Sequence, residues 1–175
     1  MKLDIKYYPD PILKVKAIEI KEITDNIKKM AYDMIETMDA YNGVGLAANQ
    51  IGEAIKILVL RPEIKNDKGE IVLGDPEIYI NSIFSNPSIE KDVMVEGCLS
   101  FPGIHIEIER PVKIHVEALD INGKKISEDF YDFRARVLMH ENDHLNGKVF
   151  IERAHKKDKE FLKEALKKLR KSRKL

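Results

Sequence analysis

The stretch of sequence that decides the fold covers residues 133–147 and reads FRARVLMHENDHLNG. Its apolar-to-mixed first half and Gly147 at its end predict a buried helix that stops at a left-handed cap. On a helix, His140 and His144 lie four residues apart, so both imidazole rings project from one face. Two imidazoles placed in this way can hold one metal ion, with Glu141 beside it to move protons. For this motif taken alone, a surface helix that carries two histidines by chance is the alternative.

Two histidines rarely suffice for a metal site, so the third ligand decides the class of protein. The single cysteine, Cys98, would supply a soft thiolate and leave a fourth position for water, as in catalytic sites. One group of metalloproteases has a third histidine where this chain has Phe150. Another group uses a downstream glutamate, and the candidates by distance along the chain are Glu152, Glu160 and Glu164. We favour Cys98, because a thiolate binds a divalent transition ion strongly.

The remaining pattern predicts an α+β fold. Thr24 is placed to cap a helix over residues 25–40, where apolar residues recur at spacings of three and four. The predicted strands cover residues 55–60, 78–84, 88–95, 104–109 and 112–119. The dipeptide Asn122-Gly123 predicts a hairpin turn after the last of these strands. We therefore expect antiparallel strands around a central metal-bearing helix near residues 130–146, with a helix toward each end of the chain.

Two further stretches accompany the HExxH motif. Residues 43–50 read GVGLAANQ, and residues 96–100 read EGCLS. The glycines of the first stretch suit either a helix-to-strand turn or a backbone that passes close to another group. In this order, the three stretches resemble the peptide deformylases, a family marked by GxGxAAxQ, EGCLS and HExxH. The resemblance covers roughly residues 5–153 and departs from the family pattern at Met139, where Gln is frequent, and at Asn142, where an apolar residue is usual.

The resemblance implies a hydrolase that removes the N-terminal formyl group from the formyl-methionine of newly made polypeptides. Metal-activated water would be the nucleophile, with Glu141 as general base and then as general acid. The implied metal ligands are Cys98, His140 and His144. The implied oxyanion donors are the Gln50 side-chain amide and the Leu99 backbone N–H. A zinc endopeptidase built on the same HExxH motif is the alternative function.

The resemblance also places residues around this centre. The implied substrate-binding residues are Val44, Gly45, Met94, Glu96, Phe133 and Val137. Behind the ligands, Arg110 would hold Glu96 in a salt bridge. From its position next to His144, Asp143 could orient a ligand, and a side chain that simply faces water is the alternative. The implied working ion is Fe²⁺, while Zn²⁺, Ni²⁺ and Co²⁺ suit the same donor set.

Charge is distributed unevenly along the 175 residues, although 30 basic residues balance 30 acidic ones. Residues 156–175 hold ten Lys or Arg and three Asp or Glu, a net charge of +7, so the preceding residues sum to −7. We expect residues 1–155 to form a deformylase-like catalytic domain, with residues 156–175 as a basic amphipathic helix of the same domain. The basic face could contact ribosomal RNA, and a solvated lysine-rich face is the alternative.

The sequence shows none of the features that are typical of membrane or secreted proteins. No apolar run is long enough to cross a membrane, and the N-terminal residues resemble no signal peptide. One cysteine allows no internal disulfide. We therefore expect a cytoplasmic protein that acts on N-formylmethionyl nascent peptides, with no membrane and no DNA as partners.

Overall fold

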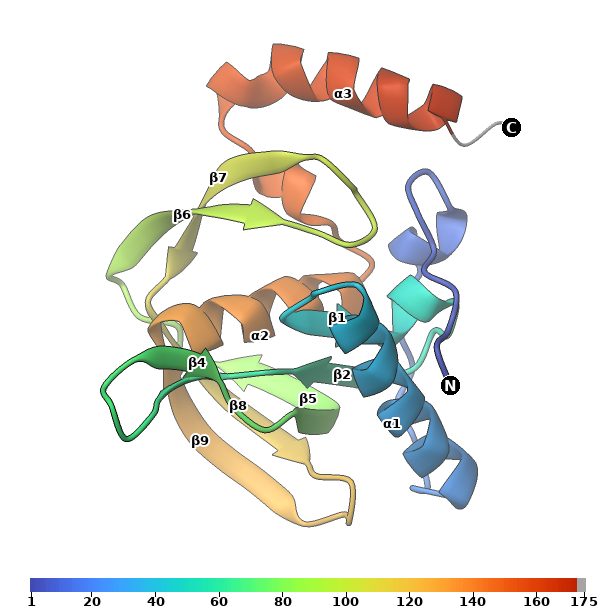
Figure 1. Cartoon of the computed structure of the whole chain (residues 1–175), viewed down its shortest axis with the longest axis vertical. Coiled ribbons are helices and arrows are strands. Elements are labelled where there is room, and N and C mark those ends of the chain that lie inside the picture. The colour runs from blue at the N-terminus through green and yellow to red at the C-terminus, as the bar shows by residue number, and fades with distance from the viewer. Residues whose placement is uncertain (173–175) are drawn as a thin grey trace.

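The computed structural model describes residues 1–172 and confirms the α+β class (Figure 1). The α-helices of the described residues are α1 (Asp25–Ala40), α2 (Asp132–Leu145) and α3 (Lys159–Ser172). The strands are β1 (Gly45–Ala47), β2 (Ile57–Leu60), β3 (Glu63–Lys65), β4 (Ile71–Leu73), β5 (Glu77–Ser85), β6 (Lys91–Gly97), β7 (His105–Pro111), β8 (Lys113–Leu119) and β9 (Lys125–Tyr131). All strand pairings within the three sheets are antiparallel.

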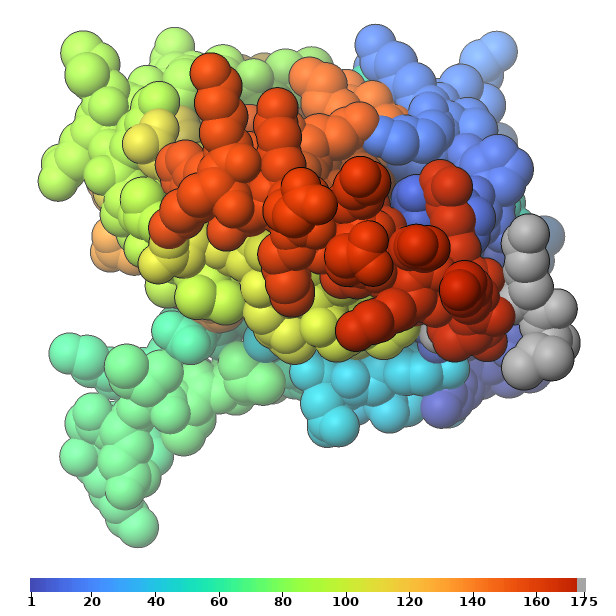
Figure 2. All heavy atoms as spheres, turned by 90° about the horizontal axis from the view of Figure 1, so that it is seen from above, coloured from blue at the N-terminus to red at the C-terminus, as the bar shows by residue number. Residues whose placement is uncertain are grey.

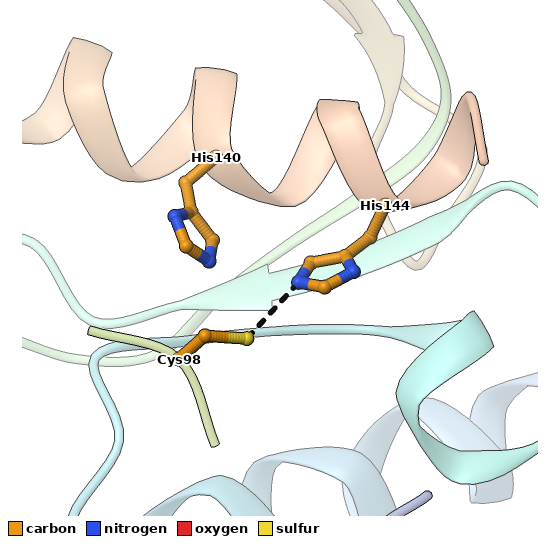
Figure 3. A group of neighbouring side chains, drawn as sticks. All are labelled: Cys98, His140 and His144. Atoms are coloured by element: carbon orange, nitrogen blue, oxygen red, sulfur yellow. Dashed lines mark hydrogen bonds between the residues drawn. The ribbon is translucent and has the colours of Figure 1, made fainter. Parts of the chain in front are cut away.

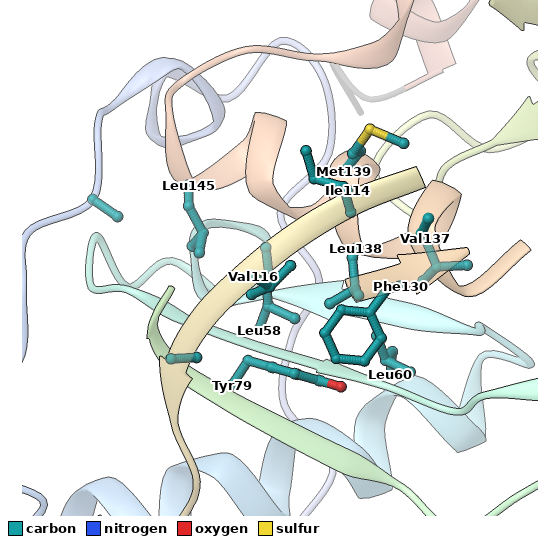
Figure 4. Close-up of a cluster of buried hydrophobic side chains, with 14 residues drawn as sticks. Leu58, Leu60, Tyr79, Ile114, Val116, Phe130, Val137, Leu138, Met139 and Leu145 are labelled. Atoms are coloured by element: carbon teal, nitrogen blue, oxygen red, sulfur yellow. The ribbon is translucent and has the colours of Figure 1, made fainter. Parts of the chain in front are cut away.

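The helix α2, which carries the HExxH motif, lies between two layers of strands (Figure 1). On one side is a five-stranded sheet in the order β1-β2-β5-β8-β9, and on the other is the β6–β7 hairpin. The sheet and α2 enclose a buried apolar cluster that includes Leu58, Val116 and Phe130 from the strands and Leu138 from the helix (Figure 4). Because α2 packs between the five-stranded sheet and the β6–β7 hairpin, the side chains of its HExxH motif are attached to a rigid element.

The strand β2 is buried on both faces and ties α1 to the same core. Its side chains alternate, as a pleated strand requires, so Leu58 packs in the cluster under α2 while Ile57 and Val59 pack with Met34 of α1. All four residues of the strand are fully buried. The predicted helix over residues 25–40 is confirmed, with the Thr24 hydroxyl accepting a hydrogen bond from the Ile27 N–H at 3.4 Å.

The end of α2 also follows the sequence pattern. The helix stops at Leu145, and Gly147 adopts a φ of +68°, the left-handed conformation expected of a cap. A Cβ at this position would clash with the backbone carbonyl of Lys14, so the chain requires glycine here.

Three short strands are absent from the sequence prediction. The glycine-rich residues 43–50 contain β1, an edge strand that pairs with β2, and β3 and β4 form a separate hairpin. Each of these strands has only three residues, too few for an alternating pattern to be visible. Gly and Ala are also poor strand formers, so β1 forms because β2 offers its edge rather than through local preference.

The last helix, α3, lies over the outer face of the β6–β7 layer (Figures 1 and 2). Its Leu162 and Leu169 are buried in a cluster with Ile106 and Ile108 of β7. The predicted amphipathic helix therefore packs on the body, although its expected last residues, 173–175, lie outside the described residues. The division into residues 1–155 and 156–175 of one domain stays a prediction. None of the helices in residues 1–172 is long and apolar enough to cross a membrane.

Candidate active site

The two histidines of α2 face the segment that follows β6, where Cys98 begins a turn (Figure 3). The Cys98 Sγ lies 3.3 Å from the His144 Nε2. One donor atom each of Cys98, His140 and His144 lies within 4.8 Å of the others. A thiolate and two imidazoles at this spacing fit a single divalent transition ion, and three protein donors are typical of catalytic rather than structural sites.

The competing third ligands lie elsewhere. Glu152 forms an ion pair with Lys14 and accepts a hydrogen bond from the Val149 N–H at 3.0 Å. Glu160 and Glu164 are exposed residues of α3. Within residues 1–172, the only Cys, His, Asp and Glu side chains grouped closely enough to hold an ion are the cysteine and the two histidines of α2.

A buried carboxylate holds one of these histidines. The Glu96 Oε2 lies 2.8 Å from the His140 Nδ1, which leaves the Nε2 of that ring for an ion. Arg110 donates to both Glu96 oxygens, at 2.6 and 2.9 Å, as the predicted salt bridge requires. Burial raises the pKa of Glu96, but hydrogen bonds with His140 and Arg110 outweigh burial and lower it to about 2. Glu96 is therefore ionised and fixes the orientation of the His140 ring.

Asp143 acts on a different partner from the predicted one. Its carboxylate accepts a hydrogen bond from Arg110 at 2.9 Å and two from Arg153, both at 2.6 Å. The Nδ1 of the neighbouring His144 is buried without a hydrogen-bond partner among the described residues. Consecutive residues of a helix point in different directions, so Asp143 cannot reach that ring and instead orients Arg110.

Arg136 is 4 % exposed and is not among the residues predicted from the sequence. Its Nη1 donates to Glu96 at 2.8 Å and to the Ile108 carbonyl at 2.9 Å, and its Nη2 donates to the Asp92 carbonyl at 3.0 Å. Arg136 therefore connects α2 to both strands of the β6–β7 hairpin. A signal was present, because Arg136 is a basic residue within an apolar stretch, one helical turn before His140.

A cavity of about 570 Å³ opens beside the ligands. Its walls include Val44, Gly45, Glu96, Phe133 and Val137, five of the six residues predicted to contact substrate. Glu96 forms part of the cavity wall, but its carboxylate oxygens already interact with Arg110, Arg136 and His140.

The sixth predicted residue, Met94, is not part of this wall, and Val95 takes its place. Side chains alternate along β6, so Met94 shares its side with Asp92 and Glu96, both of which hold Arg136. Val95 projects to the opposite side and is 64 % exposed.

Glu141 lines the same cavity and is 4 % exposed. Its Oε2 has no hydrogen-bond partner among the described residues, and burial raises its pKa to about 7. A carboxyl group in this state can accept and return a proton near neutral pH. Gly45 leaves the space that Glu141 occupies, because a Cβ at Gly45 would lie 2.5 Å from the Glu141 Oε1. The close approach expected of the glycine-rich stretch is therefore present.

Two hydrogen-bond donors lie next to the ligands. The Gln50 Oε1 accepts from the Ala47 N–H at 2.8 Å, which turns its Nε2 toward the Cys98 Sγ at 3.5 Å and the Ser100 Oγ at 3.3 Å. The Leu99 N–H donates no hydrogen bond within residues 1–172. The Leu99 N–H can therefore serve an oxygen that gains negative charge in the cavity, and the Gln50 amide can do so by giving up one of its two long hydrogen bonds.

This fold and this site define a metal-dependent hydrolase. The model of the polypeptide deformylase family matches residues 2–160, and the chain belongs to that family. Enzymes of the family remove formyl groups from peptides, and this chain is such an enzyme.

Individual relatives agree with the family match. The peptide deformylase of Psychrobacter cryohalolentis is 41 % identical over 150 residues, which cover 86 % of this chain and 78 % of that protein. The crystal structure of the peptide deformylase from Ehrlichia chaffeensis matches with a TM-score of 0.88 and 36 % identity, over 99 % of this chain and 98 % of that one. A crystal structure of the Ehrlichia protein in complex with actinonin also matches with a TM-score of 0.88, at 37 % identity and over 99 % of each chain.

Proposed function

We propose that this chain deformylates the N-terminal formyl-methionine of nascent polypeptides at one ion held by Cys98, His140 and His144, with Glu141 as the proton carrier. The observation that carries this proposal is that Cys98, His140 and Glu141, whose Oε2 has no hydrogen-bond partner among the described residues, line one cavity. We also propose a cytoplasmic location, where nascent formylated chains are made.

The ion, when bound, supplies Lewis acidity that activates water and polarises the formyl carbonyl. We propose Fe²⁺ as the working ion, and Zn²⁺, Ni²⁺ and Co²⁺ suit the same thiolate and imidazole donors. The Glu96 carboxylate keeps His140 in the tautomer with a free Nε2, because it occupies the Nδ1 side of the ring.

In the proposed reaction, Glu141 takes a proton from the attacking water and delivers it to the methionine nitrogen as the formyl carbon–nitrogen bond breaks. Its raised pKa suits both halves of this task, because neither protonation state is strongly disfavoured near neutral pH. The Gln50 Nε2 and the Leu99 N–H donate to the oxyanion that develops on the formyl group. A neutral amide provides this hydrogen bond without adding a competing charge.

The substrate would lie along the cavity. Val44, Phe133 and Val137 offer an apolar wall for the methionine side chain. The peptide backbone would pair beside β1 and residues 100–103, as an added strand does, because β1 is an edge strand of its sheet.

Formate release from a formyl-Met-Ala-Ser peptide tests this proposal. Protein loaded anaerobically with Fe²⁺ should release formate rapidly. An unformylated peptide of the same sequence should remain uncut. Peptide-bond cleavage without formate release, from folded and metal-loaded protein, would instead establish the endopeptidase alternative.

Replacement of the cysteine separates the two functions further. Cys98→Ala should lose most of the bound ion and formate release, because the thiolate is one of three donors. An endopeptidase with a downstream glutamate as third ligand would keep the ion in this variant. Metal content after dialysis is the measurement, and Ser100→Ala, two residues away in the same turn, is the control that should keep its metal.

The close approach of Gly45 to Glu141 predicts a specific effect. In Gly45→Ala, the new Cβ would push the Glu141 carboxylate and the Val137 side chain, which lie 2.5 and 2.8 Å from that position. A displacement of this kind typically costs about 100-fold in rate, so kcat should fall by about that factor while the metal stays bound. Gly69→Ala is the control: its φ of +79° strains the turn between β3 and β4, but the added Cβ meets no atom within 4 Å and the turn is not part of the cavity, so full activity should be kept. An unchanged kcat in Gly45→Ala would contradict the proposed role of Glu141.

We further propose that α3 contacts the ribosome through its basic face. Lys163, Lys167 and Lys171 repeat at intervals of four residues and line a groove of about 410 Å³ with Tyr8 and Arg170. Changing the three lysines to Gln should weaken co-sedimentation with ribosomes and reduce its salt dependence, because fewer phosphates are neutralised. Formate release should not change. Equal co-sedimentation of both proteins would favour the alternative, a solvated lysine-rich face.

A further inference from the structure

The β3–β4 hairpin projects from the body as an arm (Figure 2). Its apolar side chains are exposed, with Ile64 at 47 %, Ile71 at 65 %, Val72 at 37 % and Leu73 at 50 %. None of these residues lines the catalytic cavity. A two-stranded hairpin with exposed apolar side chains has only marginal stability by itself in water. Exposed apolar side chains grouped in this way are typical of a surface that binds a partner.

The hydrogen bonds of the hairpin determine what its free edges offer. The Asn66 N–H donates to the Glu70 carbonyl at 3.0 Å, and the Gly74 N–H donates to the Pro62 carbonyl at 2.8 Å. Since bonded pairs alternate along an antiparallel ladder, Val72 bonds inward to β3, while the N–H and C=O groups of Ile71 and Leu73 point outward. Among residues 1–172, no other strand pairs with that edge of β4.

We propose that β4 pairs with β4 of a second copy of this chain, antiparallel and about a two-fold axis that passes through Val72. In this register, Ile71 lies opposite Leu73 of the second copy, and both residues carry outward backbone groups. Each such pair exchanges both of its backbone hydrogen bonds, and the two-fold axis produces two pairs. Across the axis, Ile71 contacts Leu73 of the second copy, and Val72 contacts Val72 of the second copy. The edge of β4 therefore matches a second copy of itself, both in its backbone hydrogen-bonding groups and in its apolar side chains.

The charges of the arm limit this assembly to two copies. The outer strand β3 carries Glu63 and Lys65, whose backbone groups also point away from the hairpin. Charged side chains on an edge strand oppose further pairing, whereas β4 has none over Ile71–Leu73. The resulting sheet has the order β3-β4-β4-β3, with apolar strands inside and charged strands at both edges. Only a few residues of each copy meet, so the dimer should be weak and depend on concentration.

Sedimentation equilibrium of the metal-loaded protein tests the pairing. The wild-type mass should rise with concentration from 20.2 kDa toward twice that value. In Ile71→Glu/Leu73→Glu, like charges meet across the axis, and the protein should stay monomeric. In Ile71→Glu/Leu73→Lys, opposite charges meet in the same register, so dimerisation should return at low salt. Formate release per chain should be equal in all three proteins, because the arm is remote from the cavity.

Disulfide trapping tests the register itself. Val72→Cys places a cysteine opposite its own copy in a pair whose Cα atoms are separated by about 4.5 Å, within the range of a disulfide. This variant should form a covalent dimer on mild oxidation. Ile64→Cys is the matched control, because Ile64 lies on the same face but on the outer strand, and it should remain uncoupled. A monomer at every concentration, or a dimer that Val72→Cys does not trap, would overturn the proposal and leave the arm to a different partner.

Discussion

Replacing Glu141 with Gln should lower kcat for formate release by about 10²- to 10⁴-fold, the usual contribution of a positioned acid or base. The amide fills the same space but cannot take a proton from water or return one to the methionine nitrogen. Metal binding should be preserved, because the proposed ligand atoms belong to Cys98, His140 and His144 and not to Glu141.

The stability of this variant provides the control. Glu141 is 4 % exposed and its Oε2 has no partner among the described residues, so a neutral amide should be tolerated at least as well as the carboxylate. The midpoint of thermal unfolding should therefore be equal to or higher than that of the wild type. If Glu141→Gln retained the wild-type kcat with the ion in place, another group would have to carry the proton.

Replacing Glu96 with Gln should damage both stability and metal binding. Arg110 and Arg136 are 1 % and 4 % exposed, and the substitution leaves two buried guanidinium groups facing an amide instead of a carboxylate. Removing one partner of a buried ion pair costs about 3–5 kcal/mol, and the lower end suits a substitution that keeps the shape. Gln keeps one acceptor oxygen, which the donors of Arg110, Arg136 and His140 must then share. The His140 ring should therefore be held less firmly, and the affinity for the ion should fall by about 10- to 100-fold.

Chemical denaturation and metal titration measure these two effects separately. Glu107→Gln is a suitable control, because Glu107 lies on the neighbouring strand β7 and pairs with Lys157 at an exposed site. Exposed ion pairs contribute little, so this control should resemble the wild type in both measurements. A Glu96→Gln protein with wild-type stability would show that the buried arginines find other partners.

The position of α2 explains why few substitutions in this helix should be neutral. One face of the helix packs on the five-stranded sheet through Leu138 and Leu145, and Arg136 bonds the β6–β7 hairpin on the other side. The histidines therefore cannot move toward or away from Cys98 without disturbing a layer. Such rigidity keeps the donor atoms close together before any ion binds.

The HExxH spacing, the cysteine and the cap residues of α1 and α2 were readable from the sequence alone. Each of these is a local property: helical periodicity sets which side chains share a face, and Thr24 and Gly147 satisfy backbone groups next to them. The identity of the third ligand was a hypothesis based on chemical softness and family resemblance, and the structure brings Cys98 to the histidines.

Only the tertiary structure decided which residues hold the two histidines and which residues line the cavity. Arg136 and Arg153 join the network because distant segments meet at Glu96 and Asp143, and no local pattern encodes such meetings. The resemblance predicts Met94 in the cavity wall. In the structure, β6 is oriented so that Val95 lines the cavity and Met94 does not. The three-residue strands β1, β3 and β4 depend on a partner strand for their formation. Periodicity along the chain determines the face of each element, whereas the packing of elements that are far apart in sequence determines what that face contacts.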